Sequence, residues 1–382
     1  MEKYGMEQEG RKEDFAEKKH GMERLEGMKE FLQEDKEILL QERLMLMETD
    51  MSARDNLCSA IKKLTAGKKR TEGSGAYSLV IAFLRSSYIT GSHEFYIACY
   101  EEKPFVEEEA EGVCCSMDSF FQGAEDDCAV LYKKLQKEYV RILDGEKEEL
   151  RRWYMDGMYK KCGTLLGKFL KETRWRDGAE SPEGEEFQRE AAEEAAADVY
   201  YGGYMEGLER IGKYYFSSGF EILQSGSMKY FEASVDKNYV PPLPIGGFGT
   251  IDKITLRKKR FYEMPQNLFF LTQDHMQTVF TDVITFPCFM VSGMVKDVML
   301  SYNPFIKFAR AVLYNRKRGT SAEYYIPFLG WEEAPEKEKI KGREALEIRN
   351  GDNSYVIMRM DLTESILRRG AVGIGLKEVS VI

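Results

Sequence analysis

The sequence predicts an α+β protein, in which a mainly helical N-terminal domain is followed by a smaller α+β C-terminal domain with strand–helix–strand units. Three observations support this prediction: a seven-residue leucine repeat near the start, a change of net charge midway, and a strand–helix–strand pattern that occurs twice near the end. A chain of 382 residues also exceeds the length that one hydrophobic core usually supports. We expect a flexible arm over residues 1–22, an acidic helical domain over 23–225 and an α+β domain over 226–382.

The two predicted domains differ in charge. Residues 1–225 carry 47 acidic and 33 basic side chains, a net charge of −14, whereas residues 226–382 carry 18 and 22, a net charge of +4. Affinity for phosphate backbones comes from Lys and Arg side chains, so the acidic chain disfavours nucleic acid as a partner. The 12% aromatic content indicates a folded chain, because disordered chains are poor in aromatic residues.

Apolar runs and cysteine usage indicate the cellular compartment. No apolar run reaches the roughly 18 residues of a membrane-spanning helix, and the charged N-terminal segment lacks the apolar core of a signal peptide. Seven cysteines, odd in number and irregularly spaced, are typical of reduced thiols rather than a disulfide framework. We therefore expect a cytoplasmic protein that does not associate with a membrane.

The leucine repeat predicts a helix of about 25 residues near the start of the acidic domain. The repeat comprises four leucines: Leu25, Leu32, Leu39 and Leu46. A coiled-coil seam needs a second apolar residue in each heptad, but Asp35, Glu42 and Thr49 occupy those positions. We therefore expect the stripe to pack within its own domain, and a dimer seam remains an alternative.

The rest of the acidic domain is expected to be mostly helical. Apolar residues at helical spacing predict helices over residues 57–64, 79–88, 120–142, 150–169 and 185–223. Residues 95–100 are rich in β-forming side chains and predict one strand, whereas glycine, serine and proline over 173–184 predict a loop. Gly203, Gly207 and Gly212 in the last predicted helix are interpreted as points where a neighbouring helix packs closely.

The C-terminal domain is predicted to alternate strands with short helices. Strands over residues 228–235 and 251–261 flank a segment, 241–247, whose prolines and glycines exclude regular structure. Two strand–helix–strand units follow, over residues 289–314 and 355–382. Ser292 or Gly293 would cap the first helix, and the pattern from Asp361 to Glu364 matches a capping box for the second.

No residue pattern predicts a catalytic, metal or cofactor site. The chain has three histidines, and neither they nor the cysteines have zinc-site spacing. Cys288, His275 and either Asp274 or Asp282 would supply a nucleophile, a base and an orienting acid. Cys288 lies in an apolar run, however, which is typical of a buried structural cysteine. The glycine-rich residues 246–249 lack the lysine of a phosphate-binding loop, so we expect no cofactor.

Basic side chains of the C-terminal domain form the candidate partner-binding site. They fall in three clusters: Arg257, Lys258, Lys259 and Arg260; Arg316, Lys317 and Arg318; and Arg368 with Arg369. Clusters of this kind attract acidic surfaces and accelerate association. Because the whole chain is acidic, the expected partner is a protein with an acidic surface rather than nucleic acid.

Three segments, residues 286–299, 324–327 and 361–370, carry a resemblance to a known family. They comprise a strand that ends in Val-Ser, a short amphipathic helix, an alternating strand and a closing helix–strand pair. In these motifs residues 228–382 resemble a bacterial family grouped with the immunity proteins of polymorphic-toxin systems. The resemblance implies a cytosolic protein that binds a cognate toxin and neutralises it by covering its surface, without chemistry.

Two other functions remain open from the sequence. The long helices are compatible with a structural adaptor that self-associates, and two domains are compatible with an enzyme that has an unrecognised cleft between them. A neighbouring gene that encodes a secreted toxin would favour the immunity role over both.

Overall fold

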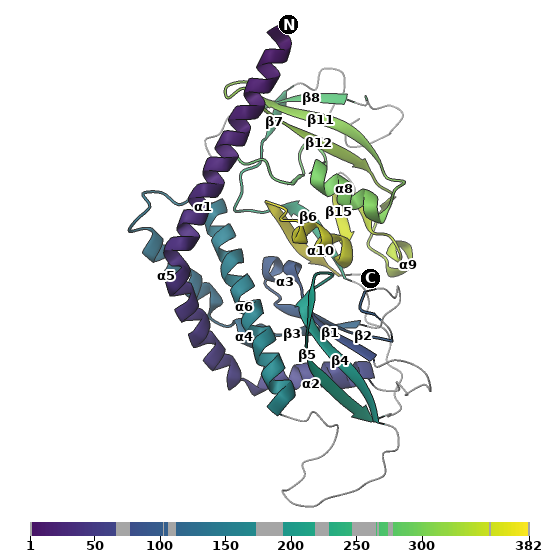
Figure 1. The fold of residues 1–382 in the computed structure, drawn as a ribbon. Helices are drawn as coiled ribbons and strands as arrows, with labels where there is room; N and C mark the ends of the chain where they lie inside the picture. The colour runs from purple at the N-terminus through teal and green to yellow at the C-terminus, as the bar shows by residue number, and fades with distance from the viewer. Residues whose placement is uncertain are drawn as a thin grey trace, which may run out of the picture. The chain divides into compact units, whose positions relative to one another are not determined.

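The computed structural model, drawn in Figure 1, describes residues 2–65, 77–101, 103–105, 112–172, 194–217, 229–246, 265, 267–273, 278–350 and 353–380. The chain forms two compact units: unit 1 comprises Met1–Gln33, Tyr132–Leu150 and Met228–Ile382, and unit 2 comprises Glu34–Leu131 and Arg151–Ser227. The predicted division after residue 225 lies next to one of these boundaries. The units differ from the predicted domains because two long helices, α1 (Glu2–Glu48) and α6 (Asp144–Glu172), each contribute to both.

The chain is α+β, with a helical N-terminal region followed by a strand-rich region, as predicted, but unit 2 also contains a five-stranded sheet where only one strand was predicted. Its strands are β1 (Tyr77–Phe83), β2 (Glu94–Tyr100), β3 (Gly112–Ser116), β4 (Glu194–Gly203) and β5 (Leu208–Ser217), in the order β3-β2-β1-β4-β5. β1 pairs in parallel with β4, and the other pairs are antiparallel. The same part of the chain also forms four shorter helices: α2 (Met51–Thr65), α3 (Arg85–Thr90), α4 (Asp118–Phe121) and α5 (Ala124–Leu135).

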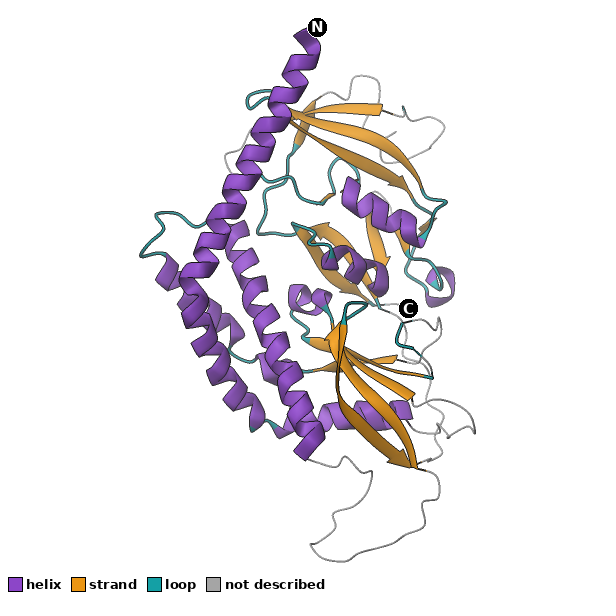
Figure 2. Ribbon diagram, in the orientation of Figure 1, coloured by secondary structure: helices purple, strands orange, loops and turns teal. Residues whose placement is uncertain are grey.

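The core of unit 2 is rich in aromatic side chains. The ring of Phe83 stacks on Tyr159 of α6 at 4.6 Å between centroids, and Phe95 lies 5.8 Å from the same ring. The Tyr201 hydroxyl donates a hydrogen bond to the Tyr159 carbonyl oxygen at 2.6 Å. Strands of the sheet and the helix α6 therefore share one buried cluster; Figure 2 colours the two kinds of element separately.

Two segments that were predicted as helices contain strands. Most of residues 79–88 lie in β1 and α3, because a short run of consecutive apolar residues fits a buried strand as well as a helix. β4 and β5 form a hairpin where one helix was predicted over residues 185–223. Glycine there serves the hairpin, since a Cβ at Gly202 would lie 2.5 Å from the Gly207 carbonyl oxygen. The predicted loop at 173–184 lies outside the described residues.

The first helix confirms the leucine-repeat prediction but is longer than predicted. α1 begins at Glu2, so it includes residues that were predicted to form a flexible arm; glutamate and lysine, abundant there, favour helix. Its buried apolar side chains are Met28 and Leu32 in unit 1 and Leu40 and Met47 in unit 2, whereas Leu46 is 60% exposed. The buried row is offset from the leucine row because 3.6 residues per turn do not match a seven-residue repeat.

Unit 1 contains two sheets, drawn in the upper half of Figure 1. The first has the order β7-β8-β11-β12-β10-β9, with strands β7 (Pro244–Gly246), β8 (Asn267–Thr272), β9 (Val283–Ile284), β10 (Met290–Ser292), β11 (Lys307–Asn315) and β12 (Thr320–Phe328). The second has the order β13-β14-β15-β6-β16, with strands β6 (Tyr230–Val235), β13 (Trp331–Glu332), β14 (Ala345–Asn350), β15 (Asn353–Arg359) and β16 (Ile374–Val379). The strand predicted over 251–261 lies outside the described residues.

Both predicted strand–helix–strand units are present in unit 1. The first is β10, α8 (Gly293–Tyr302) and β11; the second is β15, α10 (Met360–Arg368) and β16. In each unit the two strands flank a third strand that is antiparallel to both. This strand is β12 between β10 and β11, and β6 between β15 and β16. The two sheets therefore share one arrangement, although β12 follows its unit in the chain and β6 precedes its unit by more than a hundred residues.

One hydrophobic core joins the two sheets of unit 1. Its side chains come from α8, α10 and one face of each sheet, including Val291, Val298, Met358 and Ile366. Separate apolar clusters line the opposite faces, where the short helix α9 (Lys337–Ile340) contributes Ile340. Among the described helices of the chain, none is both long enough and apolar enough to cross a membrane.

The N-terminus of α8 is capped as predicted. The Ser292 side chain accepts a hydrogen bond from the Val295 amide at 3.4 Å. The Ser292 hydroxyl in turn donates to Asp282 Oδ1, and Asp282 Oδ2 accepts from the Val372 amide at 2.7 Å. Asp282 thus joins the start of α8 to the segment that precedes β16.

The capping box predicted for α10 is wrong. α10 begins at Met360, one residue before Asp361, and its N-cap residue, Arg359, makes no side-chain capping bond. Asp361 instead accepts from the Arg359 guanidinium at 2.7 and 2.8 Å and from the Leu362 amide at 2.8 Å. The Glu364 side chain is buried. The local ion pair with Arg359 has taken the carboxylate that the box requires.

Candidate functional site

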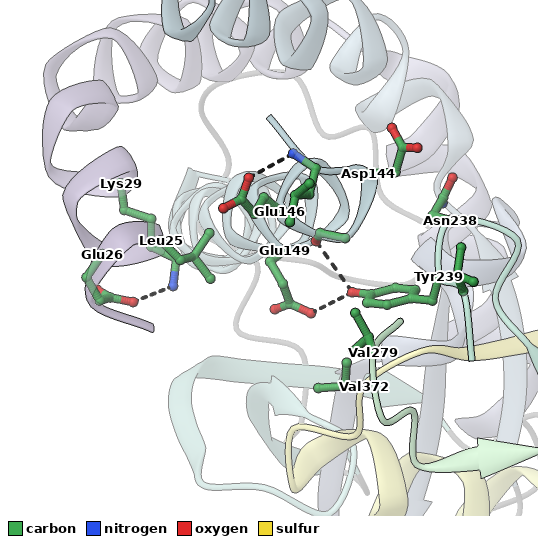
Figure 3. Close-up of a pocket in the computed structure, with 13 residues that line it drawn as sticks. Leu25, Glu26, Lys29, Asp144, Glu146, Glu149, Asn238, Tyr239, Val279 and Val372 are labelled. Atoms are coloured by element: carbon green, nitrogen blue, oxygen red, sulfur yellow. Dashed lines mark hydrogen bonds and ion pairs between the residues drawn. The ribbon is translucent and has the colours of Figure 1, made fainter. Parts of the chain in front are cut away.

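A cavity of about 450 Å³ lies within unit 1 and is drawn in Figure 3. Five separate segments line it: α1, the start of α6, the turn after β6, and two positions before β9 and β16. The lining residues are Leu25, Glu26, Lys29, Leu143, Asp144, Gly145, Glu146, Glu149, Asn238, Tyr239, Val240, Val279 and Val372. Because the segments are far apart in sequence, no local motif could have indicated this site.

The start of α6 forms the most polar wall of the cavity. Glu146 Oε2 accepts a hydrogen bond from the Leu143 amide at 2.8 Å, and Glu146 Oε1 forms an ion pair with Arg24 at 2.8 Å. Asp144 pairs with Lys147 at 2.8 Å. Carboxylates in the first turn are favourable because the amide groups there are partly positive. The start of α6 is therefore already supplied with negative charge by its own side chains.

Tyr239 is the aromatic residue of the lining, and its side chain is buried, at 7% exposed. Its backbone is held by a turn in which Asp236 Oδ1 accepts from the Asn238 amide at 2.9 Å and the Asp236 carbonyl oxygen accepts from the Tyr239 amide at 3.0 Å. Its hydroxyl donates to Glu149 Oε1 at 3.1 Å (Figure 3). The ring packs so closely on α6 that a Cβ at Gly145 would lie 3.0 Å from the ring. Glycine at this position therefore lets the ring approach the helix.

The remaining wall of the cavity is apolar. It consists of Leu25, Leu143, Val240, Val279 and Val372. The backbone amide of Val279 donates to the Val240 carbonyl oxygen at 2.9 Å, and the Val372 amide is held by Asp282. In Figure 3, Val279 and Val372 lie beside the Tyr239 ring. These backbone bonds place the valine side chains independently of any ligand.

A second candidate site is an exposed apolar area on the first sheet of unit 1. Parallel pairing of β8 with β11 places Phe269 beside Val312 and Leu271 beside Tyr314, all on the side of the sheet that faces away from the Leu268–Leu313 cluster. Phe269 is 51% exposed, and its ring lies 5.9 Å from that of Tyr314. We call these four residues, Phe269, Leu271, Val312 and Tyr314, the aromatic face.

One of the three predicted basic clusters adjoins the aromatic face. Arg316, Lys317 and Arg318 are exposed in the turn between β11 and β12, and a single residue, Asn315, separates them from Tyr314. Asn315 Oδ1 shapes this turn by accepting from the amides of Lys317 and Arg318 at 3.0 and 3.2 Å. We call Arg316, Lys317 and Arg318 the basic turn.

The other two predicted basic clusters are separate from the basic turn in the sequence. Arg368 and Arg369 lie at the end of α10, where Arg369 donates to the Ser365 carbonyl oxygen at 2.8 Å. Arg257, Lys258, Lys259 and Arg260 lie outside the described residues. Phe269 was not predicted as a site residue, because consecutive apolar residues in β8 hide the usual alternation of a strand.

Two residues suggested for the catalytic triad, Cys288 and Asp282, have other surroundings. Cys288 is buried with Ile284 and Met290 in the cluster on the first sheet. Asp282 is engaged with Ser292 and Val372, and His275 lies outside the described residues. Among the described side chains, no group of three or more His, Cys, Asp or Glu residues is placed to hold a metal ion.

Comparison with known proteins gives no family for this chain. No family model matches the sequence, and no curated protein matches it.

Proposed function

We propose that this chain acts by binding another protein through the aromatic face and the basic turn. The observation that carries the proposal is the 51% exposure of Phe269 on a regular sheet, in contact with Tyr314 and close in the chain to three exposed cations. Protein interfaces are enriched in aromatic residues and arginine, and a few such side chains carry most of the binding energy.

The aromatic face supplies the apolar centre of the proposed interface. Its residues belong to two paired strands, so their positions are set before a partner arrives. Little conformational entropy is then lost when a partner covers them. The ring pair of Phe269 and Tyr314 is the expected anchor.

The basic turn selects the sign of the partner's surface. Three adjacent cations favour a partner with acidic side chains and accelerate the encounter, and salt weakens this effect. The specific form of the proposal is an immunity-type role, in which the chain covers a cognate toxin in the cytoplasm. The resemblance of residues 228–382 supports that role. None of the seven cysteines forms a disulfide bond, which suits a reducing compartment.

The first test removes the aromatic anchor. Phe269→Ser and a matched control, Phe305→Ser, are used as bait in extracts of the source organism, because Phe305 is also exposed, at 88%, but lies after α8. We expect a partner captured by the unmodified chain to bind Phe269→Ser about tenfold more weakly and Phe305→Ser unchanged. A partner with an acidic surface is also expected. Equal binding by both variants would contradict the proposal.

The second test reverses charge in the basic turn. Arg316→Glu with Arg318→Glu is compared with Lys339→Glu and Lys341→Glu, which make the same change of charge near α9. With the purified partner, we expect the basic-turn variant to associate about tenfold more slowly at low salt, and the difference to shrink at high salt. The dissociation rate should change little. An equal decrease of the association rate in both variants would mean that the effect comes from net charge alone, and would contradict the proposal.

A further inference from the structure

We propose that the cavity in unit 1 binds a small organic cation with an apolar body, such as an alkyl- or arylammonium ion. This site lies on different residues from the aromatic face and the basic turn, and the inference does not depend on the proposed function. It assigns a ligand chemistry to a cavity that the protein-binding role leaves unexplained.

The size and walls of the cavity match a small molecule. A volume of about 450 Å³ lies within the range of pockets that enclose drug-sized ligands. One side is formed by Leu25, Leu143, Val240, Val279 and Val372, and the ring of Tyr239 completes it. An apolar body would cover these side chains and displace water from them. A fully polar ligand would leave these apolar side chains in contact with water, which is unfavourable.

The charges of the lining select a cation over an anion. Four carboxylates, those of Glu26, Asp144, Glu146 and Glu149, line the cavity with a single ammonium group, that of Lys29. Lys29 pairs with Glu26 at 2.7 Å. An anion at the start of α6 would face Asp144 and Glu146, which already complement the helix terminus. A ligand cation would be attracted by the carboxylates of the lining, two of which also pair with Arg24 and Lys147.

Glu149 and Tyr239 are the expected positions for the charged group. The Glu149 carboxylate lies 3.1 Å from the Tyr239 hydroxyl, so a carboxylate and an aromatic ring adjoin at one place (Figure 3). Carboxylates attract cations directly, and aromatic rings attract them through the negative face of the ring. Val279 and Val372 beside the ring would then contact the apolar body.

The test compares three probes that share one apolar body: 4-phenylbutylammonium, 4-phenylbutanol and 4-phenylbutyrate. Binding to the full chain is measured by calorimetry at low ionic strength. We expect the ammonium to bind about tenfold more tightly than the alcohol and the carboxylate to bind most weakly. The proposal is overturned if the carboxylate binds as tightly as the ammonium, or if no probe binds at concentrations of about a millimolar.

Three variants assign the binding to this cavity. Glu149→Gln keeps the shape and a hydrogen-bond acceptor for Tyr239 while removing the charge, and Glu138→Gln makes the same change at an exposed position outside the lining. Val279→Trp fills the cavity. We expect Glu149→Gln to weaken the binding of the ammonium about tenfold without affecting the binding of the alcohol, and Glu138→Gln to change the affinity for neither probe.

The cavity-filling variant should bind none of the three probes. Thermal unfolding and hydrogen exchange of each variant, measured without probe, establish that it is folded as the unmodified chain is. Ammonium binding that survives both Glu149→Gln and Val279→Trp would place the site elsewhere and overturn the proposal. Equal weakening by Glu149→Gln and Glu138→Gln would overturn it as well.

Discussion

The two strand–helix–strand units of unit 1 share an arrangement of strands but stabilise their helices differently. The start of α8 is bound by Ser292 and, through it, by Asp282, which also holds the Val372 amide. The start of α10 has an ion pair between residues two apart, Arg359 and Asp361. The first device connects distant segments of the chain, whereas the second is local. Equivalent topology therefore does not imply equivalent stability at the helix starts.

The largest expected effect follows from removing Asp282. Its two oxygens accept hydrogen bonds from Ser292 and from the Val372 amide, so Asp282→Ala leaves both donors to find other partners. We expect a loss of about 3 kcal/mol in the local stability of α8, because bonds to a charged acceptor are the stronger ones. Hydrogen exchange of α8 amides in the full chain measures it. Asp297→Ala, at an exposed position of the same helix, serves as the control.

Tyr302→Phe should have the next largest effect, because its hydroxyl joins α8 to α10, the helices of the two strand–helix–strand units. It donates to the Asp361 carbonyl oxygen at 2.9 Å and shares a hydrogen bond with Ser365 Oγ at 2.7 Å. We expect a loss of about 2 kcal/mol in the free energy of unfolding of unit 1, measured by urea. Tyr200→Phe, in unit 2, should change that quantity little. Equal losses in the two variants would show that the hydroxyl does not link the helices.

The same tyrosine predicts a dependence on alkaline pH. Burial raises the pKa of Tyr302 above its ordinary value of about 10. Because the unfolded chain then ionises at a lower pH than the folded chain, the stabilisation is complete below about pH 10 and is lost as pH rises through the folded pKa. Tyr302→Phe should remove this part of the alkaline loss. An unchanged pH profile in the variant would contradict the assignment.

Ser292→Ala tests the capping bond alone. We expect a loss of about 1 kcal/mol at α8, the usual value for an N-cap serine. Because Ser292 also donates to Asp282, the losses of Ser292→Ala and Asp282→Ala should not add in the double variant. Ser321→Ala, at an exposed position of β12, is the control. Additive losses would mean that the two residues act separately.

The smallest effect is expected for Asp361→Ala. The Arg359 guanidinium can return to water when its partner is lost, and the pair is too close in sequence to constrain distant segments. We expect a loss of about 0.5 kcal/mol in the stability of α10 by hydrogen exchange. A loss of stability as large as that for Asp282→Ala would mean that the local ion pair stabilises its helix as much as the long-range hydrogen bonds of Asp282 do.

The strand–helix–strand units could be predicted because their signals are local. β-forming runs end at Ser292 and near Arg359, and helical spacing begins directly afterwards. The sheet of unit 2 could not be predicted, since its central strand is buried on both faces and lacks alternation. Whether consecutive apolar residues form a helix or a strand is then decided by tertiary packing.

The candidate sites depend on contacts between distant segments to different degrees. The basic turn was predicted because its three cations are consecutive. The aromatic face needs the pairing of β8 with β11, which brings Phe269 to Val312. The cavity needs five segments, and Tyr239 reaches Glu149 across 90 residues of sequence. Side chains that come together only when the chain folds leave no pattern in the sequence.

The position of β6 has a consequence for synthesis of the protein on the ribosome. β6 lies between β15 and β16, yet 117 residues separate its last residue, Val235, from the first residue of β15, Asn353. At translation rates of about 5–20 residues per second, roughly 6–23 s pass before synthesis reaches β15, and the edge of β6 that pairs with β16 waits longer still. An unpaired strand edge is a template for wrong pairing. The nascent chain is therefore expected to need a chaperone, or a low local concentration of other nascent chains, during this interval.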